Sequence, residues 1–152
     1  MAKFFRRGKS AIYFLPAVAG ASPTRPEITA GTNLSTQITG IDGFQLSNER
    51  IDTPVLSSAY TFQIDGPDSA SGSSLTFLDD DNATTARTTC AKGTVGFLIL
   101  MPYGDVPTKR LEKWPIKSTG ANDEWSMGND PARFMIDFAV TDIPSQSGTV
   151  PA

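Results

Sequence analysis

The stretch from Ser73 to Tyr103 constrains the fold most, because it encodes a strand, a short helix and a second strand in succession. Leu75 and Phe77 alternate with small polar residues, which is the two-residue period of a half-buried strand. Residues 94–101 are strongly apolar but too few to form a membrane-spanning helix. The stretch therefore predicts one short helix packed beside a mainly β body.

The helix is expected over residues 82–92. The run Asp79-Asp80-Asp81 precedes it, and such carboxylates cap a helix and complement the positive end of its dipole. Gly93 follows as a stop. One face carries only small residues at helical spacing, so the helix can lie close against a sheet. These residues are Ala83, Ala86 and Cys90.

The 152 residues fit one domain that is large enough to bury a core. We expect a single domain over 1–152, with an N-terminal arm at 1–9, a β body at 10–144 and a C-terminal arm at 145–152. Only 39% of the residues are hydrophobic and 19% charged, and Gly, Pro, Ser and Thr make up much of the rest. That composition favours many strands joined by turns and long loops.

Hydrophobic alternation and turn residues predict an antiparallel β-sandwich or barrel of about eight strands with one short flanking helix. Asp42-Gly43 is expected to join two strands in a hairpin, and Pro115 to mark an edge strand or a bulge. Residues 16–33 and 52–60 are expected to be irregular loops, 120–123 a turn and 145–152 a polar tail. The strands are expected at 10–15, 34–41, 44–51, 61–64, 74–78, 94–101, 110–118 and 132–142.

The charge is unevenly distributed along the chain. The net charge is −3, yet four of the 13 basic residues lie in the first nine positions, at Lys3, Arg6, Arg7 and Lys9. The remainder carries nine basic against 16 acidic residues, or −7. Such a body repels phosphate, which argues against a tight DNA-binding protein.

The N-terminus imitates a secretory signal, with a basic start and an apolar stretch at 11–18. That stretch is short, and Pro16 interrupts it. The better interpretation is a basic, aromatic arm at Lys3–Arg7 that leads into the first strand. Such arms are disordered unless a partner holds them.

No residue pattern predicts catalysis or a cofactor. The chain has no histidine, and its single cysteine, Cys90, cannot form an internal disulfide and is expected to be a buried, inert thiol. The acidic run at 79–82 lacks the ligand spacing of an EF-hand, so capping explains it better than metal binding. Two carboxylate pairs have no catalytic spacing, so we predict a protein that is not an enzyme and has no cofactor. These pairs are Asp123 with Glu124 and Glu112 with Asp105.

Four aromatic residues leave an alternative open. Trp114, Trp125, Tyr103 and Tyr13 could stack on a sugar or on single-stranded bases, although tryptophan in a small β-domain usually seals the core. With the signal-like N-terminus, these residues would suit a secreted β-sandwich that binds carbohydrate or a cell-surface receptor.

The order of several segments along the chain resembles the tail tube (major tail) proteins of long-tailed bacteriophages, particularly those that infect actinobacteria. The resemblance covers nearly the whole sequence. The segments are ERIDTPVLSS, FQIDGPD, SSLTFLDDD, the helix that ends in AKGT, the strand into MPYGD, RLEKWPIKSTGANDEWSMGNDPARFMIDFAV, and the terminal VPA.

The resemblance implies a structural subunit that assembles into stacked rings, usually of six copies, around a conduit for the genome. It implies a location in the virion tail, assembly in the host cytoplasm and no membrane insertion. The implied partners are other copies, the tape measure protein, the tail terminator and distal tail or baseplate proteins, with transient, non-specific passage of DNA. The basic arm is expected to dock against an acidic face of a neighbour.

The expected subunit contacts follow from the arm, the 52–60 loop and the C-terminal tail, which the resemblance places against neighbouring rings. They are Lys3, Phe4, Phe5, Arg6, Arg7, Asp52, Thr53, Pro54, Val55, Leu56, Val150 and Pro151.

Overall fold

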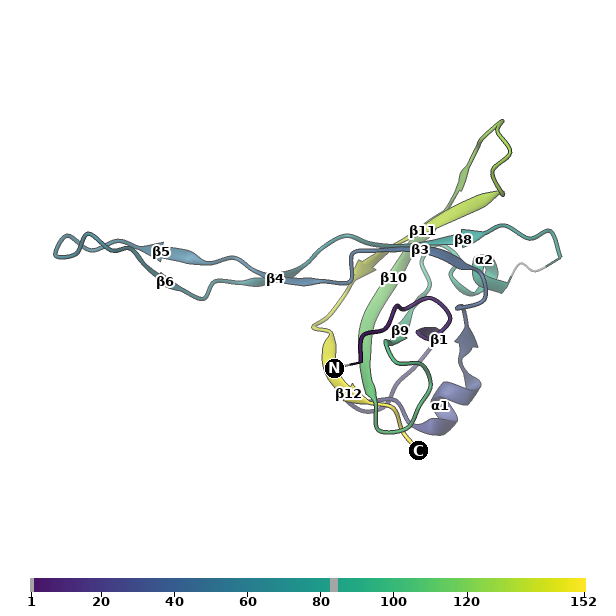
Figure 1. Ribbon diagram of the computed structural model, residues 1–152, viewed down its shortest axis with the longest axis horizontal. Coiled ribbons are helices and arrows are strands. Elements are labelled where there is room, and N and C mark those ends of the chain that lie inside the picture. The colour runs from purple at the N-terminus through teal and green to yellow at the C-terminus, as the bar shows by residue number, and fades with distance from the viewer. Residues whose placement is uncertain (1, 83–84) are drawn as a thin grey trace.

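The computed structural model describes residues 2–82 and 85–152, and it confirms a mainly β, antiparallel fold (Figure 1). The main sheet has eight strands: β1 (Ala11–Leu15), β2 (Thr32–Asn33), β3 (Ile38–Asp42), β8 (Ser73–Leu78), β9 (Val95–Met101), β10 (Arg110–Glu124), β11 (Arg133–Val140) and β12 (Ser145–Thr149). Two further ladders pair β4 (Leu46–Asn48) with β7 (Asp68–Ala70) and β5 (Ile51–Thr53) with β6 (Phe62–Ile64). The helices are α1 (Arg25–Ala30) and α2 (Thr85–Thr89).

The main sheet curls until its two edges approach each other. Its order is β2-β1-β9-β10-β11-β8-β3, and β12 pairs with β10 beside this path. The edge strands β2 and β3 are consecutive in the chain and are joined only by residues 34–37. Leu34 donates its N–H to the carbonyl oxygen of Ile12 on β1, and Leu78 on β8 donates to the carbonyl oxygen of Gln37. The sheet thus forms a nearly closed barrel, and the gap between its two edges, which we call the seam, lies between β1 with its short partner β2 and β3. Residues 34–37 bridge this seam at one end.

Both faces of the sheet carry a core, as the alternation along β1, β9 and β10 requires. The larger core contains Trp114 and Phe77 and includes Ala86 and Cys90 from the α2 segment. On the opposite face, Ile28 of α1 packs with Leu15, Ile99 and other residues of the smaller core. The buried aliphatic residues of one strand thus serve two separate cores.

The α2 segment is shorter than the expected 82–92 helix, and Ala83 lies outside the described residues. Cys90 is fully buried behind the helix, and its carbonyl oxygen accepts a hydrogen bond from Ser118 Oγ at 2.7 Å. Gly93 has a positive φ of 86° and donates its N–H to the Ser118 carbonyl oxygen at 2.9 Å. These two bonds fasten the turn after α2 onto β10.

Helix α1 lies within residues 16–33, which were expected to be irregular. Thr24 and Glu27 have the spacing of a capping box, and Pro26 lies at the start of the helix. Glu27 Oε2 accepts the Thr24 N–H at 2.8 Å. The helix is then held by the burial of Ile28, a long-range contact that no local pattern shows.

The expected hairpin at Asp42-Gly43 is wrong. β3 pairs with β8, whereas the next strand, β4, pairs with β7 outside the main sheet. Gly43 and Phe44 both have positive φ, at 80° and 57°, so the backbone turns away from the sheet at this point. The turn residues were identified correctly, but they mark an exit from the sheet and not a reversal.

The expectation that Pro115 lies on an edge strand is also wrong, because β10 lies between β9 and β11. Pro115 pairs with Phe97 on β9, and its carbonyl oxygen accepts the Thr141 N–H from the other side at 3.1 Å. The nitrogen of a strand residue points to the same side as its carbonyl oxygen. The nitrogen of Pro115 therefore faces the side of β10 away from β9. On that side the pairing with β12 ends at Lys113 and the pairing with β11 begins at Ile116, so the absent N–H costs no ladder hydrogen bond.

The expected turn at 120–123 lies in a strand, and so do residues 145–149 of the expected polar tail at 145–152. Residues 120–124 continue β10 past a bulge between Ser118 and Gly120 and pair with β11. Residues 145–149 form β12 along the first part of β10. Both segments are polar because one side of each faces solvent. Their pairing could not be predicted from local sequence, because it depends on a partner strand elsewhere in the chain.

Candidate functional site

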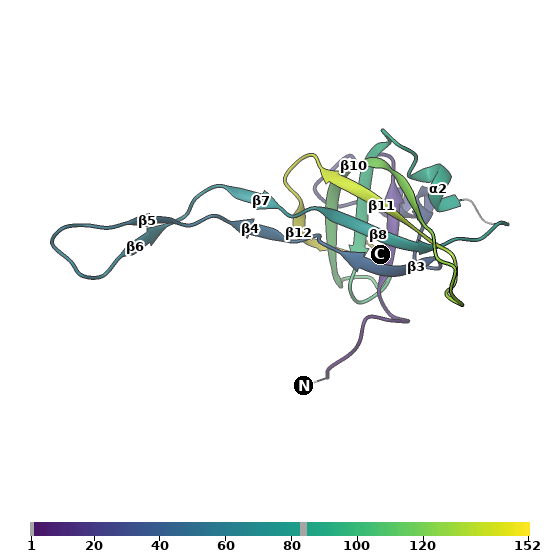
Figure 2. The ribbon, with the colours of Figure 1, turned by 90° about the horizontal axis from the view of Figure 1, so that it is seen from above.

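A long hairpin, residues 45–72, projects far from the barrel and is the most prominent feature of the molecule (Figures 1 and 2). It consists of the β4–β7 ladder near the body and the β5–β6 ladder beyond it. Residues 52–60, expected to be a loop, thus begin inside β5. Between the two ladders the hairpin strands still lie close together, because a Cβ on Gly66 would overlap the Glu49 carbonyl oxygen.

The hairpin is anchored in the barrel by Phe44. Its ring is 6% exposed and meets the Trp114 ring edge-on, with 5.6 Å between the centroids. Ser73 Oγ accepts the Phe44 N–H at 3.1 Å. A Cβ on Gly43 would lie 2.8 Å from the Ser73 Cα, so the two hairpin strands leave the body in close contact. The root is therefore fixed although the hairpin itself is solvated.

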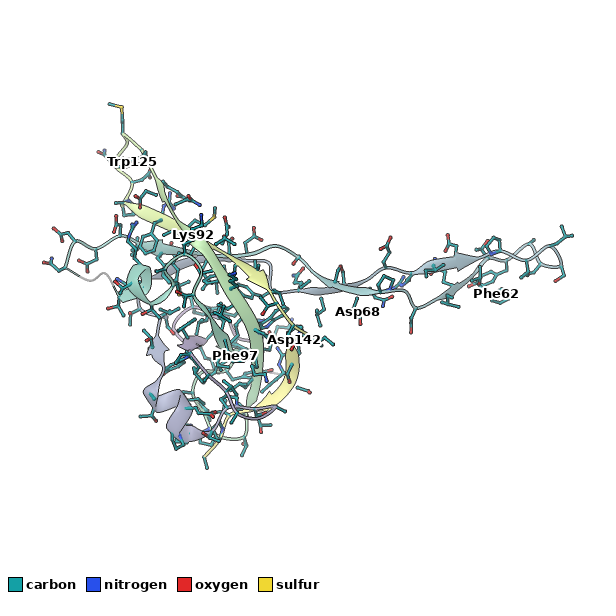
Figure 3. The ribbon with its side chains drawn as sticks, turned by 180° about the vertical axis from the view of Figure 1, so that it is seen from behind. Phe62, Asp68, Lys92, Phe97, Trp125 and Asp142 are labelled. Atoms are coloured by element: carbon teal, nitrogen blue, oxygen red, sulfur yellow. The ribbon has the colours of Figure 1, made fainter. Side chains whose placement is uncertain are left out.

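The outer ladder has one apolar face that nothing in the described chain covers. Ile51 lies opposite Ile64, and Thr53 lies opposite Phe62 on the same face. The two isoleucines and Phe62 are 47–54% exposed, and the Tyr60 ring packs on Phe62 at 5.1 Å. On the other face, Gln63 donates to Asp52 Oδ1 at 2.8 Å. This segment is an amphipathic two-stranded ribbon (Figure 3).

An isolated two-stranded hairpin is marginally stable in water. The exposed apolar face of the β5–β6 ladder extends to Val55 and Leu56 at the tip, which are 47% and 107% exposed. Of the expected contact residues in this segment, Asp52 and Pro54 are also exposed, and Thr53 is half-buried. Sequence reasoning missed Tyr60, Phe62 and Ile64, although the alternation of Phe62 and Ile64 with polar residues was available as a signal. This face is suited to covering by another molecule.

The N-terminal arm extends away from the body (Figure 2) but contacts it through Phe4, and Ser10 is bonded to the body just after the arm. The Phe4 ring lies 5.1 Å from the Tyr103 ring, and Lys9 Nζ lies 4.8 Å above Phe4. Ser10 Oγ donates to the Pro102 carbonyl oxygen at 2.7 Å. Phe5 is 78% exposed. The arm thus presents one free aromatic ring together with its charges.

The cations of the arm have no acidic partner within residues 2–82 and 85–152. None of Lys3, Arg6, Arg7 and Lys9 forms an ion pair there, and Lys3, Arg6 and Arg7 are exposed. The basic residues that do form such pairs are Arg25, Arg87, Arg110 and Arg133. The arm is therefore a concentrated positive charge available to a partner.

The C-terminal residues lie against their own body. Val150 is 2% exposed in the smaller core, and Pro151 is half-buried. Arg25 of α1 donates from Nη2 to the Pro151 carbonyl oxygen at 2.6 Å. In this arrangement Val150 presents no surface to a neighbouring molecule, unlike the arm and the hairpin.

A second hairpin, β10–β11, also carries an exposed apolar tip (Figure 3). Trp125 is 92% exposed and Met127 106%. Trp114, in contrast, is fully buried and donates from Nε1 to Glu112 at 3.1 Å, so it cannot stack on a ligand. Sequence reasoning did not single out Met127.

The four carboxylates considered as possible acid–base pairs are each engaged by a different arginine. Arg25 Nη1 lies 2.8 Å from Asp105, and Arg87 Nη2 lies 2.6 Å from Asp123. Glu112 lies 3.3 Å from Arg110, and Glu124 lies 3.6 Å from Arg133. The hydrogen bond to Asp123 raises the pKa of Arg87. Three of these contacts link different segments of the chain, and the Arg110–Glu112 contact lies within β10.

The remaining candidates for chemistry have structural roles. Burial raises the pKa of the Cys90 thiol to about 12, which leaves it protonated and unreactive near neutral pH. Asp80 Oδ1 accepts the Asn82 N–H at 2.9 Å, an ordinary turn contact. Across the described ranges 2–82 and 85–152, no three acidic or cysteine side chains gather as metal ligands would. No helix in this part of the chain is long and apolar enough to cross a membrane.

A family model described as phage tail tube protein matches residues 1–152. The chain belongs to the phage tail tube protein family. This membership confirms the resemblance inferred from sequence and makes the protein a structural component of the virion tail, not an enzyme. The alternative of a secreted carbohydrate-binding domain is not supported.

Solved structures share the tail tube fold at low sequence identity. A chain of the extended-state sheath/tube terminator of the PVC extracellular contractile injection system has a TM-score of 0.68 at 10% identity, covering 97% of this chain and 99% of that one. A chain of the native gene transfer agent virion has a TM-score of 0.60 at 15% identity, covering 95% and 100%. A chain of the anti-feeding prophage baseplate reaches 0.66 at 8%, covering 97% and 98%. Among curated proteins, no sequence matches this tail tube protein.

Proposed function

We propose that this protein polymerises into stacked, hexameric rings that form the tail tube and conduct the phage genome during ejection. The observation that carries the proposal is the projecting hairpin with its uncovered apolar face of Ile51, Phe62 and Ile64. Such a face is stable in water only when a partner covers it. The 6-fold symmetrised anti-feeding prophage baseplate and the tail of the gene transfer agent with C6 symmetry contain chains of this fold and support six copies per ring.

The geometry favours polymerisation over closed dimers. The hairpin projects far from the body, and we infer that its apolar face contacts a surface of another copy that differs from itself. A contact between two different surfaces is heterologous and propagates into a ring or a filament. Lys3–Arg7 and Asp52–Leu56 are the proposed contact segments. Val150 and Pro151 would join them only after release from Arg25.

The charge distribution suits a conduit for DNA. Outside the N-terminal arm, the chain carries 16 acidic and nine basic residues. Because phosphate contacts make DNA adhere, a wall of this sign lets DNA pass without binding it tightly. We further propose assembly in the host cytoplasm, with the tape measure protein, the tail terminator and distal tail or baseplate proteins as partners.

Electron microscopy of the purified protein, with light scattering across a concentration series, tests the assembly. We expect rings or tubes with six-fold symmetry. A protein that stays monomeric at every concentration, including with purified tail terminator added, would contradict the proposal.

A matched pair of variants tests the hairpin. Phe62→Ser with Ile64→Ser removes the apolar face, and we expect tubes to be lost while the circular dichroism of the body is unchanged. Trp125→Ser with Met127→Ser removes a comparably exposed apolar surface from the other hairpin, and we expect tubes to persist. The opposite result would assign the assembly contact to the β10–β11 tip.

A further inference from the structure

The N-terminal arm lies beside an apolar groove in the barrel seam. Two adjoining hollows, of about 590 and 670 Å³, both border on Arg6. They follow the open part of the seam between β1 and β3, where Ile12, Ile38 and Ile41 supply the apolar walls. Arg7 lines the second hollow. We call this surface the seam groove.

The seam groove can admit a partner from solvent. Ile41 is 51% exposed, and among residues 2–82 and 85–152 β3 has a ladder partner, β8, on one side only. A strand with one free edge invites pairing with another extended segment. The one carboxylate in its lining, Glu112, is already engaged by Arg110 and Trp114. The groove therefore presents apolar walls, a free strand edge and positive charge.

The projecting hairpin has the complementary properties. Residues 45–72 carry four carboxylates and one guanidinium, a net −3, while the arm carries four cations. The carboxylates Glu49, Asp52 and Asp65 form no ion pair with any described residue of the chain. Its β5–β6 ladder offers exposed Ile51, Phe62 and Ile64 on an extended ribbon with free edges.

The outer ladder cannot reach the groove of its own chain. The hairpin root at Phe44 and Leu46 lines one end of the groove, whereas β5 and β6 lie at the far end of the projection (Figures 1 and 2). A β5–β6 ladder that occupies the groove must therefore come from a second copy.

We propose that the β5–β6 hairpin of one copy docks into the seam groove of the next, with its carboxylates against Arg6 and Arg7. This inference rests on the proposed assembly. The hairpin of one copy and the N-terminal arm of the next then form the two halves of one interface. Each copy has one hairpin and one groove, so the contact repeats from copy to copy. Burial of the apolar face stabilises the contact, and the opposite charges set the relative orientation of the two copies and raise their association rate.

Charge reversal with rescue tests the pairing. We expect Arg6→Glu with Arg7→Glu to raise the critical concentration for assembly by about tenfold or more. Glu49→Lys with Asp65→Lys should raise it by a similar factor. A tenfold change corresponds to about 1.4 kcal/mol of association free energy. The four changes together should restore assembly. Lys92→Glu with Lys117→Glu, two exposed cations elsewhere on the body, should leave it unchanged. Failure of the fourfold variant to recover, with folded protein by circular dichroism, would overturn the pairing.

Directed cross-linking gives an independent answer. Ile41→Cys and Ile64→Cys are made in separate proteins, and Cys90 gives little background because it is buried. We expect a mixture of the two to form a disulfide-linked dimer, and neither protein to do so alone. Ile41→Cys mixed with Trp125→Cys should form none. Tubes that assemble normally without the Ile41–Ile64 cross-link would overturn this inference and leave the proposed function standing; absence of any assembly would instead overturn the proposed function.

Discussion

The Arg25 guanidinium on α1 bonds both carboxylate oxygens of Asp105, with Nη1 at 2.9 and 2.8 Å. Nη2 of the same guanidinium bonds the Pro151 carbonyl oxygen at 2.6 Å. The hydrogen bond that Arg25 donates to Asp105 raises the pKa of Arg25. One side chain therefore joins the first helix, the turn after β9 and the C-terminal residues.

Replacing Arg25 with methionine is expected to loosen the C-terminus without unfolding the body. The Val150 amide bonds the Lys109 carbonyl oxygen and the Thr108 amide bonds the Val150 carbonyl oxygen, so both should exchange hydrogen faster. Hydrogen–deuterium exchange measures this directly. Arg50→Met, at an exposed arginine without an ion pair among the described residues, is the control. Unchanged exchange at both amides would show that β12 and Val150 hold the segment without Arg25.

Gly43→Ala should destabilise the hairpin root. Gly43 has a φ of 80°, and an added Cβ would meet the Gly72 and Ser73 backbone, so we expect the free energy of unfolding to fall by about 1–3 kcal/mol. At Gly72 an added Cβ meets nothing within 4 Å, and Gly72→Ala should stay within about 0.5 kcal/mol of the wild type. Urea denaturation under conditions that keep the protein monomeric compares the two. Equal effects would contradict the prediction.

Phe44→Ala tests whether the hairpin is anchored through the core. Truncating this buried ring beside Trp114 should lower the free energy of unfolding by about 3–5 kcal/mol and change the Trp114 fluorescence. Phe5→Ala, at a ring that is 78% exposed, should change it by less than about 0.5 kcal/mol. A small effect of Phe44→Ala would mean that the exit from the barrel does not depend on this ring.

Cys90 should make the fold less stable in alkaline solution. The pKa of its thiol is about 12 in the folded state and 9.0 when unperturbed, so above pH 9 the unfolded chain loses this proton and the folded chain keeps it. The free energy of unfolding therefore falls as pH rises from about 9 to 12, with a limiting slope of about 1.4 kcal/mol per pH unit. Below pH 9 the thiol has no such effect.

Because lysines and tyrosines also titrate in that range, the measurement is the difference between the wild type and Cys90→Ala. The variant should lack this part of the slope. In the folded wild type, the thiol should react with a disulfide reagent at pH 8 only as the protein unfolds. Rapid reaction of the native protein would contradict the buried environment.

Local sequence patterns were sufficient for strands whose burial alternates regularly. The strand β8 (Ser73–Leu78) was predicted over residues 74–78, because Leu75 and Phe77 alternate with residues that face the other side. β11 was recognised in the same way through Phe134 and Ile136. In the projecting hairpin, the strands predicted at 44–51 and 61–64 contain β4 and β6. β7 was not predicted, because only Ala70 of Asp68–Ala70 is partly buried and the strand depends on its pairing with β4.

The exposure of the candidate contact segments was anticipated in part. The arm at Lys3–Arg7 and the tip at Val55–Leu56 are exposed, as their composition suggested. The apolar face of Phe62 and Ile64 was missed, since its exposure depends on where the hairpin points. Val150 was placed in an arm, but its burial depends on Ile28 and Leu111, which are distant in sequence.

The sequence by itself determined the β class, the single inert cysteine, the charge contrast between arm and body, and the family. These follow from composition, periodicity and the order of segments, all of which are local or additive. Only the tertiary structure decided that Ser73–Tyr103 forms part of a barrel with two cores, that Asp42-Gly43 sends the chain out into a projecting hairpin, and that the arm lies beside an open seam. The physical reason is that strand partners and the exposure of apolar faces are set by contacts between residues far apart in the chain.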